Sequence, residues 1–186
     1  EGQIGPDDFY SVPCVVPLSL FLERLHNRQM TKLSCHPACG SATYIYAEDG
    51  KIIPITRFVD VDGFFDLIRQ INEDGEKNHS VWKAKAMNKI AKGIPGLINK
   101  EKMPESINIA ELVISFLKGN IKAEEEFAKK SMLIGAMHFM DRYNFDCQRV
   151  QRCIIHYSTP DDRIIPFCSY NAIHRPIVEK KFSKDL

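Results

Sequence analysis

Six cysteines are the residues of this sequence whose type and spacing indicate chemistry. Two of them, Cys35 and Cys39, bracket the tripeptide His-Pro-Ala, and the proline together with the following glycine predicts a loop. Short loops beside strands present thiolates to iron–sulfur clusters and to zinc, and three intervening residues allow both sulfurs to face one centre. The pair therefore predicts metal ligation, with inert buried thiols and a disulfide as the alternatives.

A site with four thiolates needs two further ligands. Cys14 follows a proline in irregular chain, while Cys153 and Cys168 are expected on the two arms of a predicted hairpin. Cys147 is expected to be a structural helix residue. The predicted metal ligands are Cys14, Cys35, Cys39, Cys153 and Cys168. Their spacing does not choose between an iron–sulfur cluster and zinc, because four thiolates bind either.

Composition limits the other classes of function. The 186 residues carry a formal net charge of +1 and a pI near 7.8, so the basic surface that nucleic-acid binding requires is not expected. No apolar run reaches the roughly 18 residues of a transmembrane helix, and no signal peptide is recognisable at the start. We therefore expect a cytoplasmic location, and in that reducing compartment six cysteines favour metal binding over disulfides.

Periodicity predicts helices in the first half and the middle of the chain. A short helix is expected at about 17–27 with its apolar side chains on one face, and another follows a cap at Asp60 or Asp62. Further helices are expected over about 80–140, the last of them continuing through the apolar residues 132–140.

Two pairs of strand-like runs flank turn-forming tetrapeptides. Residues 43–47 and 52–56 surround Glu-Asp-Gly-Lys, and residues 150–158 and 163–169 surround Thr-Pro-Asp-Asp. The order hairpin, helices, hairpin predicts an α+β fold, with a small antiparallel sheet from the two β-hairpins and a central group of helices. Because the length suits one domain, we interpret residues 1–186 as a single cysteine-rich domain that binds a metal cluster.

The other polar residues are expected to be mainly structural. His36 lies between two predicted ligands but is expected to face solvent, and His138 is expected to be a core histidine of a helix. Arg57 and Asp60 are interpreted either as a structural ion pair or as contacts to a polar group of a substrate. A polar cluster that follows the last cysteine is a candidate for lining a pocket: Tyr170, Asn171, His174 and Arg175.

Five runs along the chain resemble the C-terminal part of a radical SAM family, that of archaeal tetraether lipid synthase and the related pterin methyltransferase-like proteins. They read VPC at 12–14, CHPACGSATY at 35–44, IPITRFVD at 53–60, RCIIHYSTPD at 152–161 and RIIPFCSYN at 163–171. The resemblance extends with gaps over nearly the whole chain. It implies an auxiliary [4Fe–4S] cluster held by cysteines of this chain, next to a radical SAM core domain in the same or another chain.

The resemblance also sets a limit. The family's C-x₃-C-x₂-C motif, whose cluster cleaves S-adenosylmethionine, is absent here, because the next cysteine after Cys39 is Cys147. The chain is therefore expected to be the auxiliary cluster domain of a radical SAM enzyme, either as a fragment or as a free-standing relative. The full enzyme would use S-adenosylmethionine on unactivated C–H bonds of a lipid or pterin. The alternatives are a zinc-stabilised structural or binding module without redox chemistry and a scaffold with inert thiols.

Overall fold

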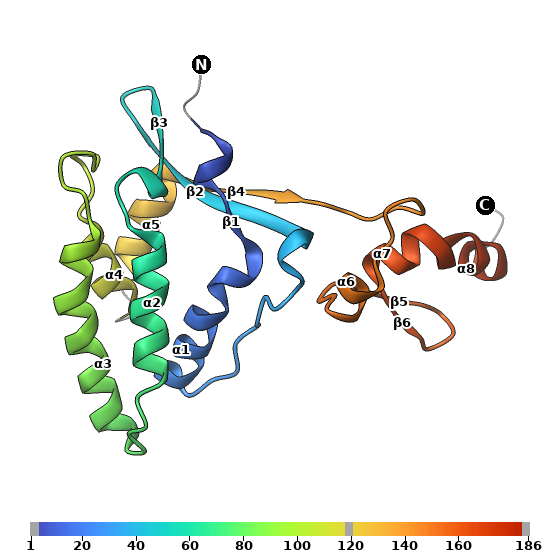
Figure 1. Cartoon of the computed structure of the whole chain (residues 1–186), viewed down its shortest axis with the longest axis horizontal. Helices are drawn as coiled ribbons and strands as arrows, with labels where there is room; N and C mark the ends of the chain where they lie inside the picture. The colour runs from blue at the N-terminus through green and yellow to red at the C-terminus, as the bar shows by residue number, and fades with distance from the viewer. Residues whose placement is uncertain (1–3, 118–120, 184–186) are drawn as a thin grey trace. The chain divides into compact units, whose positions relative to one another are not determined.

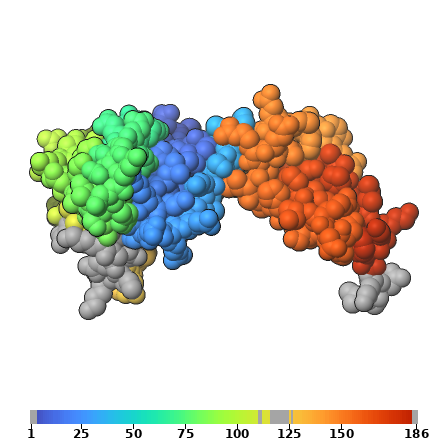
Figure 2. Space-filling model, turned by 90° about the horizontal axis from the view of Figure 1, so that it is seen from below, coloured from blue at the N-terminus to red at the C-terminus, as the bar shows by residue number. Residues whose placement is uncertain are grey.

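The protein, described here by a computed structural model, is defined at residues 4–117 and 121–183. It divides into two compact units. The first unit contains Glu1–Tyr10, Cys14–Lys32 and Ala42–Gly135, and the second unit contains Ser11–Pro13, Leu33–Ser41 and Ala136–Leu186. Each can be followed by residue colour in the ribbon (Figure 1) and in the space-filling view (Figure 2). That residues 1–186 act as one cysteine-rich domain stays a prediction.

Helices make up most of the first unit (Figure 1). They are α1 (Val16–His26), α2 (Val61–Asn72), α3 (His79–Gly93), α4 (Ile109–Leu117) and α5 (Ile121–Lys130). Short 3₁₀ turns lie at Pro6–Asp8, Val12–Val15, Ile55–Arg57 and Ile94–Leu97. The Asp60 carboxylate accepts a hydrogen bond from the Gly63 amide and caps α2, as the sequence predicts. Asn78 caps α3 in the same way.

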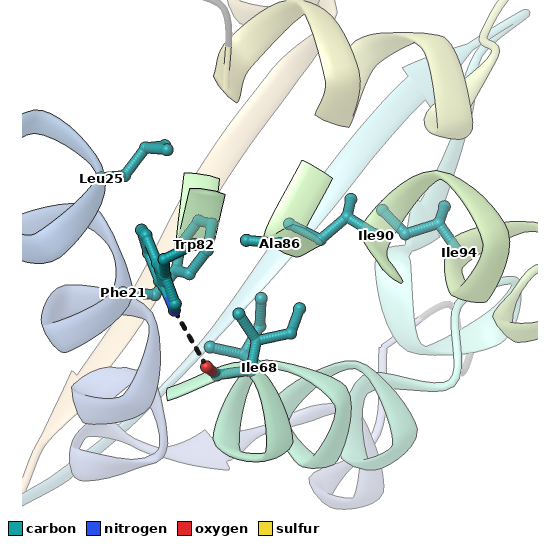
Figure 3. Packing of buried hydrophobic residues seen from close by; sticks show 8 residues of the cluster. Phe21, Leu25, Ile68, Trp82, Ala86, Ile90 and Ile94 are labelled. Atoms are coloured by element: carbon teal, nitrogen blue, oxygen red, sulfur yellow. Dashed lines mark hydrogen bonds between the residues drawn. The ribbon is translucent and has the colours of Figure 1, made fainter. Parts of the chain in front are cut away.

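Apolar side chains of α1, α2 and α3 form the main core (Figure 3). Trp82, Ala86 and Ile90 lie four residues apart on α3 and are all fully buried, so the predicted helical face is confirmed. The indole N–H of Trp82 donates to the carbonyl of Ile71 at 3.3 Å, which leaves the largest core side chain without an unsatisfied donor. The buried members of this core are Phe21, Leu25, Ile68, Ile71, Trp82, Ala86, Ile90 and Ile94.

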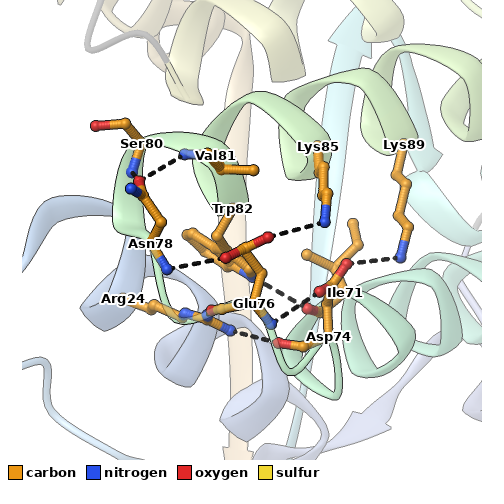
Figure 4. A network of polar contacts seen from close by, with 10 residues as sticks. All are labelled: Arg24, Ile71, Asp74, Glu76, Asn78, Ser80, Val81, Trp82, Lys85 and Lys89. Atoms are coloured by element: carbon orange, nitrogen blue, oxygen red, sulfur yellow. Dashed lines mark hydrogen bonds and ion pairs between the residues drawn. The ribbon is translucent and has the colours of Figure 1, made fainter.

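Charged side chains surround one edge of this core (Figure 4). The guanidinium of Arg24 lies 4.2 Å from the Trp82 ring centroid and donates to the carbonyl of Asp74 at 3.0 Å. Lys85 pairs with Glu76 at 3.1 Å, and Lys89 pairs with Asp74 at 3.4 Å. The lysines of α3 therefore cover a solvated face, and these half-exposed pairs contribute little to stability.

One sheet contains the first predicted hairpin. Its strands are β1 (Tyr10–Ser11), β2 (Gly40–Glu48), β3 (Lys51–Pro54) and β4 (Ser131–Met137), in the order β1-β2-β3 with β4 also paired to β2. The hairpin pairs Glu48 with Lys51 antiparallel, and positive φ angles at Asp49 and Gly50 form its two-residue turn. The first hairpin is therefore confirmed.

The expectation that residues 132–140 continue the preceding helix is wrong. Helix α5 ends at Lys130, and β4 begins directly after it. A short apolar run such as Met-Leu-Ile-Gly-Ala-Met fits a buried helix or a strand equally well by periodicity. Pairing with β2, which is distant in sequence, decides in favour of the strand.

The second unit is built from short elements. They are the 3₁₀ turn Pro37–Cys39, α6 (Cys147–Gln151), β5 (His156–Ser158), β6 (Ile164–Pro166), α7 (Phe167–Ser169), a π-helical turn (Tyr170–His174) and α8 (Arg175–Phe182). Strands β5 and β6 pair antiparallel, with Tyr157 opposite Ile165, and Asp162 has a positive φ in the predicted turn between them. The α+β fold with small antiparallel sheets is thereby confirmed.

The second hairpin is shorter than predicted. Cys153 precedes β5 and Cys168 lies in α7, so the prediction that these cysteines occupy the two arms of the hairpin is wrong. The turn residues are recognisable in the sequence, but the length of the arms depends on which backbone groups pair. No helix in the described part of the chain combines the length and the apolar character needed to cross a membrane.

Candidate functional site

The loop that carries Cys35 and Cys39 is short and internally hydrogen-bonded. The Cys39 amide donates to the carbonyl of His36 at 2.8 Å, and the His36 ring accepts from the Ala38 amide at 3.2 Å. These bonds form the 3₁₀ turn, and β2 starts at the next residue. Cys35 is 4% exposed and Cys39 is half-buried. The predicted placement of this pair on a loop before a strand is confirmed, and His36 serves the loop itself.

Residues 138–140, which directly follow β4, hydrogen-bond to this loop. The His138 amide donates to the carbonyl of Cys39 at 2.9 Å. Gly40 makes the close approach possible, because a Cβ there would lie 2.6 Å from the Met137 sulfur and 2.9 Å from the Ala136 carbonyl oxygen. The prediction that His138 is a core histidine of a helix is wrong, since it is exposed and lies beyond β4.

The same segment contacts two further parts of the second unit. The Met140 amide donates to the sulfur of Cys168 at 3.4 Å. The carbonyl of His138 accepts from the guanidinium of Arg149, which is a residue of α6. Cys153 is the second residue after the end of α6. Residues 138–140 therefore contact three separate stretches of the chain: the Cys35–Cys39 loop, the helix that precedes Cys153, and Cys168.

Burial and neighbouring residues shift the pKa of the Cys35 thiol. Burial raises the pKa of this thiol, and Cys39 and Cys153 raise it further, whereas a backbone hydrogen bond and the charge of Arg152 lower it. Cys39, Cys153 and Arg152 consequently lie within electrostatic range of Cys35. A bound metal cation would favour the thiolate form of all three cysteines.

The sulfur atoms themselves do not converge. Among the residues that the structure describes, no three His, Cys, Asp or Glu side chains lie close enough together to hold a metal ion. All six cysteines are free thiols, and the Cys153 thiol donates to the carbonyl of Ile155 at 3.0 Å. Four of the five predicted ligands, Cys35, Cys39, Cys153 and Cys168, thus belong to the second unit, while ligation of a metal by them stays a prediction.

Cys14 and Cys147 have different surroundings. Cys14 belongs to the first unit, where burial and the nearby Asp62 raise the pKa of its thiol and Arg69 lowers it. That Cys14 ligates a metal also stays a prediction. Cys147 is the first residue of α6, which confirms its helical position, and it is exposed.

Two buried charges are not apparent from the sequence. Arg149 is 5% exposed, and its Nε atom has no hydrogen-bond partner in the described residues. Asp8 is 2% exposed and pairs with Arg57 at 2.7 Å, so the structural interpretation of Arg57 holds. Asp60 caps α2 instead of pairing with Arg57. No local pattern indicates either buried charge, because both acquire their partners or their burial from distant segments.

A hollow of about 330 Å³ opens beside the cysteine loop. Its lining comes from the loop, the start of β2 and the end of β4: Pro37, Ala38, Gly40, Ser41, Ala136, Met137 and His138. A small ligand that enters this hollow would contact the cysteine loop.

A curated protein is similar to almost the whole of this chain. No family model matches the chain. The chain is 49% identical over 189 residues to a 7,8-dihydro-6-hydroxymethylpterin dimethyltransferase of Methanocaldococcus jannaschii, and the match covers 98% of this chain. The chain spans 37% of the length of that relative. The resemblance to pterin methyltransferase-like proteins is thereby confirmed, whereas membership of a radical SAM family stays a prediction.

Proposed function

We propose that this chain is the auxiliary cluster-binding part of a radical SAM enzyme that transfers methyl groups to a reduced pterin. In this proposal Cys35, Cys39, Cys153 and Cys168 hold a [4Fe–4S] cluster. The observation that carries it is the contact of the segment 138–140 with the Cys39 backbone, the Cys168 sulfur and the helix that precedes Cys153.

The chemistry of the surroundings supports a cluster of thiolates. Amide donors such as that of Met140 hydrogen-bond to coordinating sulfurs in iron–sulfur proteins and tune their reduction potential. Arg149 and Arg152 place two positive charges on the helix turn before Cys153, and a four-thiolate cluster is an anion. The unpartnered Nε of the buried Arg149 is a donor that such an anion would satisfy.

The substrate class rests on the similarity to the pterin dimethyltransferase, which covers almost the whole chain. A lipid substrate has no comparable support. The chain lacks the C-x₃-C-x₂-C motif, so cleavage of S-adenosylmethionine is assigned to another part of the full enzyme. A bound cluster would supply one-electron transfer or a Lewis-acid site for the substrate.

Iron content after anaerobic purification tests the proposal. The wild-type chain should contain about four irons and four sulfides and show the brown colour of a [4Fe–4S] protein. Alanine at Cys35, Cys39, Cys153 or Cys168 should lower the iron content, because each variant removes one of the four proposed ligands. Cys14→Ala and Cys147→Ala are matched controls and should keep it.

Three outcomes would count against the proposal. A wild-type chain that stays colourless after anaerobic reconstitution would overturn it. Zinc in place of iron under these conditions would favour a structural zinc module. Equal iron loss in Cys14→Ala and Cys35→Ala would show that the ligand set is different. Circular dichroism of each variant separates loss of the cluster from loss of the fold.

A further inference from the structure

Four aromatic rings of the second unit lie next to one another and form a surface that we call the aromatic face: Phe139, Tyr157, Phe167 and Tyr170. Phe139 and Tyr157 are exposed, and Phe167 and Tyr170 are half-buried. The ring centroids of Phe139 and Phe167 are 4.9 Å apart, and those of Tyr157 and Phe167 are 5.3 Å apart. Tyr157 and Tyr170 follow at 4.5 Å. Despite these contacts Phe139 is 51% exposed and Tyr157 is 38% exposed.

The end of the second hairpin brings two of these rings, Tyr157 and Phe167, together. Tyr157 lies opposite Ile165, and directly opposed residues of an antiparallel pair point to the same face. Phe167, the first residue of α7, donates its amide hydrogen to the carbonyl of Ile155 at 2.9 Å, and this bond holds its ring beside that of Tyr157. Ile155 is 45% exposed and, two residues before Tyr157, extends the apolar surface.

The second unit has little apolar interior of its own. Both hydrophobic clusters found among the described residues consist of side chains of the first unit. In the second unit, by contrast, large apolar side chains remain open to solvent, including Tyr143 at 99% and Ile177 at 64%. Exposed aromatic and aliphatic side chains of this kind are typical of protein interfaces, where Tyr and Phe are enriched.

We propose that the aromatic face is a docking surface for the part of the pterin methyltransferase that lies outside this chain. The greater part of the M. jannaschii relative has no counterpart here, which supplies a partner of sufficient size. The proposal rests on the proposed function, because it assumes that this chain works together with that part. It also has a consequence for chemistry: Cys168 lies between Phe167 and Tyr170, so docking would bring the proposed cluster to the interface.

Carbene footprinting with a photoactivated diazirine tests this surface on two intact proteins, this chain and the full M. jannaschii dimethyltransferase. In this chain, peptides that contain residues 139, 155–157 and 167–170 should be heavily labelled. Their counterparts in the full relative should lose most of that labelling. Peptides from α3, whose contacts lie within the first unit, serve as the matched control and should be labelled alike in both proteins.

Equal labelling of the aromatic face in both proteins would overturn the proposal. So would protection already present in this chain at low concentration. Protection that grows with the concentration of this chain would identify a second copy as the occupant instead. The double variant Phe139→Ser/Tyr157→Ser, made at the aligned positions of the full relative, should restore labelling of the remaining face.

Iron measured on the same samples keeps the two proposals separate. Protection of the aromatic face in a protein without iron would support the docking proposal and count against the cluster proposal. Iron without protection would overturn the docking surface and leave the cluster proposal standing.

Discussion

Replacing Asp8 by asparagine tests the polar contact that joins the first turn of the chain to the loop after β3. Asp8 is 2% exposed, and its carboxylate accepts hydrogen bonds from the Gly5 amide at 2.8 Å and the Thr56 hydroxyl at 2.6 Å. The Arg57 guanidinium donates a third at 2.7 Å. A buried carboxylate with three donors is expected to stabilise the first unit.

The magnitude follows from what asparagine cannot do. It keeps the size of the side chain, but only one of its two polar atoms accepts hydrogen bonds. At least one charge-assisted bond, from Thr56 or Arg57, is therefore lost, and such a bond contributes about 1.5–3 kcal/mol. The Arg57 side chain is 50% exposed, so water solvates the freed guanidinium and limits the cost. We expect the free energy of unfolding to fall by about 2–3 kcal/mol.

The effect should depend on pH. Burial raises the pKa of the Asp8 carboxyl, but hydrogen bonds from Thr56 and Gly5, with the hydrogen bond and charge of Arg57, lower it more, so it lies below the ordinary value of 3.8. Because the pKa is lower in the folded chain than in the unfolded chain, the stabilisation is fully present above the unfolded pKa. It is lost as the pH falls through the folded pKa.

Urea unfolding followed by the fluorescence of Trp82, the one tryptophan of the sequence, measures the change directly in the core of the first unit. Asp66→Asn is the matched control: its side chain is 63% exposed, and it should cost less than about 0.5 kcal/mol. A cost for Asp8→Asn no larger than that of the control, or a difference from wild type that is the same at pH 3 and pH 7, would refute the reasoning.

Three further predictions concern single side chains. Ile68 is 1% exposed in the main core, so Ile68→Ala should lower the free energy of unfolding by about 3 kcal/mol. Ile68→Val should lower it by only about 1 kcal/mol, and equal costs of the two variants in urea unfolding would contradict this. Asn78→Ala should cost about 1 kcal/mol because it removes the cap of α3, and Asn78→Asp, which keeps an acceptor, should restore most of it. Hydrogen bonds from Arg163 and Thr159 lower the pKa of Asp161 to about 2. An NMR titration should find that pKa in the wild type and a higher pKa of Asp161 in Arg163→Gln. The same pKa in both proteins would contradict the structure.

Much of the first unit is predictable from local patterns. The helical face of Trp82, Ala86 and Ile90, the cap at Asp60 and the Asp-Gly turn of the first hairpin are all found where the sequence places them. Each depends on interactions between residues at most four positions apart. Such interactions are determined by residue type and need no knowledge of the rest of the chain.

The errors occur where a distant partner decides the local structure. Residues 131–137 become a strand because β2 offers a pairing edge, although their composition also suits a helix. Cys168 lies in α7 because the pairing of β5 with β6 ends at Pro166. The sequence predicts His138 inside a helix, but this residue directly follows strand β4 and is exposed.

For the candidate site, the sequence by itself determined the chemistry that is available: six cysteines, a tight Cys35–Cys39 loop before a strand, and further cysteines near the end of the chain. Only the tertiary structure decided which of these share a neighbourhood. It gathers Cys35, Cys39, Cys153 and Cys168 in the second unit around His138–Met140, and it places Cys14 in the first unit. The physical reason is that backbone hydrogen bonds between segments about a hundred residues apart leave no periodic trace in the sequence, whereas loops and caps do.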